Sequence, residues 1–114
     1  MSLGRAALKQ RMFVRECALC IPGTWIDNYT NWRNFVFAMK SAMPDAEGLK
    51  ITCEVASRAP RFPTGHGTTE LWDSASPNGE LTAGSIIYWA QTLNPVGFAS
   101  ICALCESSFP IKYP

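Results

Sequence analysis

The sequence has little charge, one histidine and no excess of charge of either sign. Only 17% of its 114 residues are charged, and 10 Lys and Arg against 9 Asp and Glu leave a formal net charge of +1. A protein that neutralises many phosphates normally carries a marked basic excess, so we expect no extensive contact with nucleic acid. His66 stands between Gly65 and Gly67 in an expected turn. A catalytic triad or a multi-histidine metal site is therefore not expected, and we predict a chain that is not an enzyme and holds no cofactor.

Long apolar runs are also missing. The best candidate for a membrane span, residues 86–105, is interrupted by Gln91, Asn94, Pro95 and Ser100, so we expect no transmembrane segment. What is present is an apolar share of 47%, which is enough for one domain with a hydrophobic core. The basic residues that precede the first acid are typical of a mitochondrial import segment and equally of an ordinary basic N-terminus.

Alternating apolar and polar side chains predict two strands in the first half of the chain. The alternation runs over residues 10–17 and again over residues 49–55, where Ile51 is placed on the buried face. A helix lies between them in the sequence. Because a crossover helix joins parallel strands, we expect a βαβ unit with its two strands parallel.

The helix of this unit is predicted over residues 26–43. Apolar side chains recur there at three- and four-residue steps, at Ile26, Tyr29, Val36, Met39 and Met43. Phe35 is also placed on the core face. Asp27 or Thr30 can cap the start of the helix, and Pro44 sets its end.

The second half of the chain predicts a hairpin and a further helix. Residues 61–66 and 68–72 are short segments separated by a glycine, which fits two strands. Residues 81–93 have helical spacing with Thr82 as N-cap. The resulting order, β-α-β-β-β-α, is that of an α/β thioredoxin-like sandwich.

This order divides the chain into three parts. Residues 1–9 form a basic N-terminal segment, residues 10–93 form the thioredoxin-like domain, and residues 94–114 form a C-terminal extension that docks on this domain or on a partner.

Several short motifs resemble one mitochondrial family. They are a strand ending in Cys17, the helix core Arg33-Asn34-Phe35-Val36, the helix stop Met43-Pro44-Asp45, a strand ending near Glu54, and Pro60 before a short hairpin. The family is thioredoxin-like. It is shared by a small accessory subunit of respiratory complex I, the NADH:ubiquinone oxidoreductase, and by mitochondrial ribosomal proteins.

The resemblance implies a structural role without catalysis. It predicts an accessory subunit of respiratory-chain complex I (NADH dehydrogenase) that supports assembly and stability on the matrix side of the inner membrane, with other subunits as partners. The alternative is a structural protein of the large mitochondrial ribosomal subunit, whose members also extend beyond Leu93 but are commonly basic. The resemblance further implies that Cys17 and Cys53 lie side by side and can pair as a disulfide, whereas two free buried thiols fit equally well.

The tetrapeptide Cys-Ala-Leu-Cys occurs twice and offers an alternative function. Its thiols are Cys17, Cys20, Cys102 and Cys105. Paired C-x-x-C motifs are typical of zinc sites or of thiol redox centres. Ala and Leu between the cysteines are instead typical of buried, packed thiols.

Aromatic residues are numerous for a small domain and predict a partner surface. The interface candidates are Trp25, Trp72, Trp89 and Phe98. Large rigid rings bury area at low entropic cost, and Trp25 in a Pro-Gly loop is the first choice as an anchor.

Overall fold

The computed structural model describes residues 4–61, 67–76 and 79–108. Within them every regular element is a helix, and there is no strand. The seven helices are α1 (Arg5–Leu19), α2 (Gly23–Ile26), α3 (Tyr29–Ala42), α4 (Ala46–Ala56), α5 (Thr68–Ser74), α6 (Ala83–Leu93) and α7 (Pro95–Ser108). The predicted order β-α-β-β-β-α and the α/β thioredoxin-like sandwich are therefore wrong.

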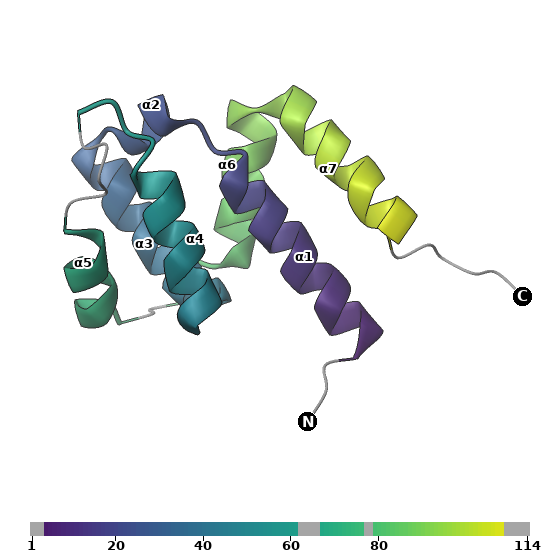
Figure 1. Ribbon diagram of the computed structural model, residues 1–114, viewed down its shortest axis with the longest axis horizontal. Coiled ribbons are helices and arrows are strands. Elements are labelled where there is room, and N and C mark those ends of the chain that lie inside the picture. The colour runs from purple at the N-terminus through teal and green to yellow at the C-terminus, as the bar shows by residue number, and fades with distance from the viewer. Residues whose placement is uncertain (1–3, 62–66, 77–78, 109–114) are drawn as a thin grey trace, which may run out of the picture.

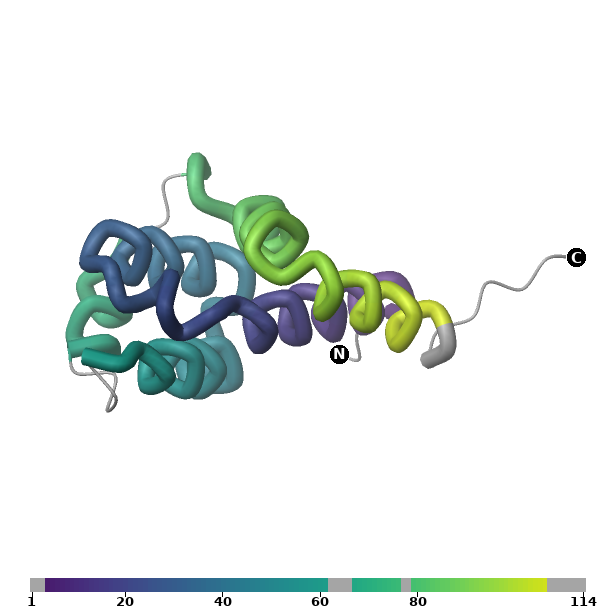
Figure 2. Tube along the Cα trace, turned by 90° about the horizontal axis from the view of Figure 1, so that it is seen from above, coloured from purple at the N-terminus to yellow at the C-terminus, as the bar shows by residue number. Residues whose placement is uncertain are grey.

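Four of the helices pack around one core. In Figure 1, α4 lies in front of α3; α4 also packs against α1, α1 against α6, and α6 against α3, so that the four form a closed ring. The short helices α2 and α5 both pack against α3 and α4 at one end of the bundle. Helix α7 packs against α1 and α6, and Figure 2 shows α1 and α7 side by side at the other end. None of the described helices combines the length and the apolar character needed to cross a membrane.

The core lies where the four helices meet. Its largest fully buried apolar side chains are Ile21, Ile26, Phe35, Val36, Met39, Met43, Val55 and Ile86. Each large apolar side chain removed from water contributes about 1.5–3 kcal/mol to folding. Phe35 and Ile51 are 0% and 4% exposed, so the prediction that both are buried is confirmed.

The strand predicted over residues 10–17 lies within helix α1. The side chains that α1 buries are Val14, Cys17 and Ala18, at the three- and four-residue steps typical of one helix face. A period-2 pattern over so few residues fits either structure, and the helix-favouring residues before it extend α1 to 15 residues.

The strand predicted over residues 49–55 is helix α4. Its buried positions are Gly48, Ile51, Thr52, Val55 and Ala56, which form a continuous helical stripe. Thr52 interrupts the apolar pattern in the sequence, but its hydroxyl donates a hydrogen bond of 2.7 Å to the Gly48 carbonyl oxygen. A threonine whose hydroxyl bonds to a carbonyl oxygen of its own helix can face the core. The sequence pattern placed Thr52 on the solvent side because it does not show this hydrogen bond.

The predicted hairpin is also absent among the described residues. Residues 68–72 belong to α5, which follows Gly67 at a φ of 82°, a left-handed conformation that glycine adopts readily. Residues 62–66 lie outside the described residues. The C-terminal extension contains α7, which docks on α1 and α6, and residues 109–114 again lie outside the described part.

The helices predicted over residues 26–43 and 81–93 are present with later starts, as α3 and α6, whereas Ile26 belongs to the separate helix α2. Helix α3 ends at Ala42, ahead of Pro44, but its N-cap is Asn28, whose Oδ1 accepts from the Asn31 N–H at 3.0 Å, in place of Asp27 or Thr30. Helix α6 has Thr82 as N-cap, accepting from the Gly84 N–H at 3.2 Å.

Candidate functional site

The structure places the two Cys-Ala-Leu-Cys motifs on neighbouring helices. Cys17 and Cys20 lie at the end of α1, and Cys102 and Cys105 lie on α7 beside it. The two helices run antiparallel, since the Asn94 side chain donates to the Cys20 carbonyl oxygen at one end and Lys9 pairs with Glu106 toward the other. The two motifs are far apart in the sequence, so the sequence by itself did not predict that they lie on neighbouring helices.

The surroundings of Cys17, Cys20 and Cys105 favour the neutral, packed thiol. Burial, followed by the neighbouring cysteines, raises the pKa of Cys17 to about 12. Burial also raises the pKa of Cys20 and of Cys105. The thiolate is the metal ligand and the nucleophile, so a raised pKa disfavours both roles. No group of three or more His, Cys, Asp or Glu side chains within the described ranges is placed to hold a metal ion.

All five cysteines are free. Cys17 is buried in the α1 face of the core, whereas the Sγ of Cys53 on α4 lies 3.8 Å from the Thr69 hydroxyl oxygen on α5. The resemblance that implied a Cys17–Cys53 disulfide rested on strands, and both residues lie on helices.

The four predicted interface aromatics contact other parts of the chain. Trp72 is 5% exposed. Trp25 packs on Trp89 with ring centroids 4.9 Å apart, which ties α2 to α6. Phe98 packs on Phe13 at 5.8 Å, which ties α7 to α1. Trp25, Trp89 and Phe98 are all partly buried against the core, so their rings hold the bundle together.

An apolar groove lies between the first half of α1 and the second half of α7. Its volume is about 310 Å³, and it is lined by Ala6, Lys9, Gln10, Phe13, Cys102, Cys105 and Glu106. The Lys9 ammonium and the Glu106 carboxylate form an ion pair of 3.3 Å across it.

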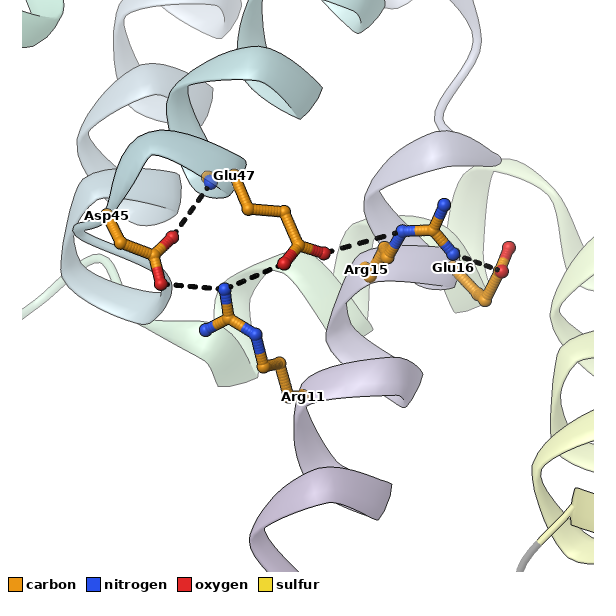
Figure 3. A network of polar contacts seen from close by, with 6 residues as sticks. Arg11, Arg15, Glu16, Asp45 and Glu47 are labelled. Carbon is orange, nitrogen blue, oxygen red and sulfur yellow. Dashed lines mark hydrogen bonds and ion pairs between the residues drawn. The ribbon is translucent and has the colours of Figure 1, made fainter. Parts of the chain in front are cut away.

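A network of charges joins α1 to the start of α4 (Figure 3). The Arg11 guanidinium lies 2.7 Å from an Asp45 oxygen and 3.0 Å from a Glu47 oxygen. Arg15 lies 3.7 Å from Glu47 and 3.1 Å from Glu16. Asp45 is the N-cap of α4, and its carboxylate accepts a hydrogen bond from the Gly48 N–H. This hydrogen bond, followed by the contact with Arg11, lowers the pKa of Asp45. The network thus ties α1 to α4, and the lowered pKa favours the ionised form of Asp45.

One face of α3 carries aromatic and cationic side chains in alternation. We call Tyr29, Arg33, Phe37 and Lys40 the α3 face; at about 100° of rotation per residue they fall within roughly 80° of one another. Tyr29 was predicted to face the core, but it is 69% exposed. The four-residue spacing of Tyr29, Arg33 and Phe37 is visible in the sequence, and it is the signal that could have identified this face.

Within the α3 face Arg33 contacts Phe37, whereas Tyr29 and Lys40 contact neighbouring tryptophans. The Arg33 guanidinium carbon lies 4.3 Å from the Phe37 ring centroid. The Tyr29 ring lies 5.7 Å from that of Trp32, whose indole N–H donates to the Thr68 hydroxyl at 3.0 Å. Lys40 lies 5.8 Å from the Trp72 ring and donates to the Trp72 carbonyl oxygen.

Comparison with known proteins gives one match. A family model described as Primase C terminal 2 (PriCT-2) matches residues 14–90, which is 77 of the 114 residues and runs from the middle of α1 into α6. Neither the curated proteins nor the solved structures compared gave a match.

The match, together with the helical fold, overturns the mitochondrial thioredoxin-like resemblance. It also overturns the roles drawn from that resemblance, in complex I and in the mitochondrial ribosome, and it gives no support to a zinc or thiol redox function. Because the family model covers about two thirds of the sequence, the chain belongs to the Primase C terminal 2 (PriCT-2) family.

Proposed function

We propose that this chain is a non-catalytic helical module of a primase, which acts by contact with the priming machinery and not by chemistry of its own. The match of residues 14–90 to the Primase C terminal 2 family carries the proposal. Its description names a C-terminal part of primases, so we assign the chain a place beside a primase catalytic domain, in the same polypeptide or as a separate protein.

The state of the carboxylates supports the non-catalytic part of the proposal. Nucleotide polymerisation uses acidic side chains that hold metal ions at the reacting phosphates. Here Asp45 and Glu47 are paired with Arg11, and both Asp27 carboxylate oxygens accept from Arg61, at 3.1 and 2.8 Å. The contacts of these three acids stabilise a helix end and a loop, which is a structural role.

A priming assay with the full chain tests the proposal. The chain is mixed with single-stranded template, nucleotides and Mg²⁺, alone and together with a primase catalytic domain from the same organism. We expect no primer from the chain alone, and a changed primer yield or length when both are present. Direct association of the two proteins is measured in parallel by calorimetry.

Two results would overturn the proposal in different parts. Primer synthesis by the chain alone would refute its non-catalytic character. Unchanged priming together with no measurable association would refute its role as a primase module.

A further inference from the structure

We propose that the α3 face binds a short stretch of single-stranded polynucleotide, with bases on its aromatic rings and phosphates on its cations. This inference rests on the proposed function and deepens it, because a primase works on a single-stranded template. It concerns one or two nucleotides, which is consistent with a chain whose net charge of +1 disfavours extensive nucleic-acid contact.

The aromatic part of the α3 face is held ready for stacking. Tyr29 is the most exposed aromatic side chain among the described residues, at 69%, and it packs on Trp32. Trp32 is itself held by its hydrogen bond to Thr68 on α5, so Tyr29 rests on a ring that is fixed in place. Phe37 is partly exposed and is not among the side chains packed on the core. Base stacking on such rings is independent of sequence.

The cations of the α3 face differ from most of the others in the described chain. Lys9, Arg11, Arg15, Arg58 and Arg61 all form ion pairs with carboxylates. Arg33 and Lys40 contact aromatic rings and form no ion pair with a described carboxylate. The exposed acids of the adjoining helix α5, Glu70 and Asp73, pair with neither of them. A guanidinium and an ammonium that lack a carboxylate partner are suited to phosphate oxygens.

This combination favours a single strand over a duplex. In a duplex the faces of the bases are covered by their neighbours, so exposed rings gain little, whereas a single strand offers both bases and phosphates along one line. Tyr29, Arg33 and Phe37 also follow one another along the helix axis. A polynucleotide single strand lying along α3 would therefore meet an aromatic ring, a cation and a second aromatic ring in turn.

Fluorescence anisotropy with the full chain and labelled oligonucleotides tests the inference at low and moderate salt. We expect single strands to bind more tightly than a duplex of the same sequence. Oligothymidylate and oligouridylate serve as separate arms, and a preference for either supports the inference and identifies a DNA or an RNA strand as the ligand. Tyr29→Ala should weaken binding about fivefold or more, as loss of one stacked base does. Arg33→Ala should reduce the slope of log K against log salt by about 0.7, as expected for one phosphate contact on a single strand.

Two matched variants serve as controls. Tyr88 on α6 is 63% exposed, a fraction similar to the 69% of Tyr29. Lys50 on α4 is an exposed cation for which no ion pair is found among the described residues. Tyr88→Ala and Lys50→Ala should leave oligonucleotide affinity unchanged, and circular dichroism should show all four variants folded.

The inference is overturned if no single strand binds, if the duplex binds equally well, or if the control variants lose as much affinity as the α3 variants. It is also overturned if the α3 variants lose association with the primase catalytic domain while oligonucleotide affinity is unchanged. Stimulation of priming without oligonucleotide binding would refute this inference alone and leave the proposed function standing.

Discussion

Replacing Gly48 with alanine should destabilise the fold strongly, although alanine is the better helix former. Gly48 lies in the first turn of α4 and is buried against the end of α3. A Cβ added there would overlap the Met43 carbonyl oxygen and stand 2.8 Å from the carbonyl carbon. Because these are main-chain atoms, they cannot rotate away, and α4 must shift as a whole.

The expected magnitude follows from three contributions. Overpacking costs about 1–3 kcal/mol. We take the upper end of this range because the Met43 main chain cannot move aside. The shift would also break the cap in which the Gly48 N–H donates to Asp45 at 3.1 Å, which costs about 1 kcal/mol. Alanine's helix propensity offsets about 1 kcal/mol. We expect a net loss of about 3 kcal/mol, or roughly 12–24 °C in Tm for a domain of this size.

The matched control is Gly84→Ala in the first turn of α6. A Cβ at Gly84 would meet only the Thr82 hydroxyl oxygen, at an ordinary 3.4 Å. That variant should be as stable as the wild type or up to about 1 kcal/mol more stable. Urea denaturation followed by circular dichroism compares the two. If Gly48→Ala proves as stable as Gly84→Ala, the close approach of α3 and α4 is refuted.

Three other predictions concern the core, the charge network and the buried thiols. Phe35→Ala should cost about 3–5 kcal/mol in urea denaturation, and a cost below about 1 kcal/mol would show that the ring is not in the core. The pKa of Asp45 is lowered, first by the Gly48 N–H and then by Arg11, so its contribution to stability is present above about pH 4 and is lost as the pH falls through the lowered value. Asp45→Asn keeps a capping side chain but should flatten the acid limb of the stability profile, and an unchanged limb would contradict this assignment. Cys17 should resist alkylation near neutral pH in the native state and react after unfolding, as followed by mass spectrometry; rapid native labelling would refute its burial.

The candidate site was accessible to sequence reasoning only in part. The spacing of Tyr29, Arg33 and Phe37 is local to one helix, and that helix was predicted correctly. Which side of α3 faces the core depends on the helices that pack against it. The sequence prediction placed Tyr29 on the core side because its aromatic ring continues the apolar spacing of the helix. Whether Arg33 and Lys40 have carboxylate partners depends on helices that are distant in the sequence.

Local chemistry in the sequence determined several features of this protein. The end of α3 ahead of Pro44, the cap of α6 at Thr82 and the burial of Phe35 follow from rules that act within a few residues. The near-neutral charge and the absence of long apolar runs are likewise properties of composition.

Tertiary structure alone decided the fold class. Over five to eight residues an alternating pattern fits a strand or a helix, and the choice depends on which side chains find a buried neighbour. In α4 the core accepts Thr52 because Gly48 satisfies its hydroxyl, and in α1 it selects Val14 and Cys17. The proximity of the two Cys-Ala-Leu-Cys motifs arises in the same way, because α7 folds back along α1. Such contacts join residues far apart in the chain, so no window of the sequence contains them.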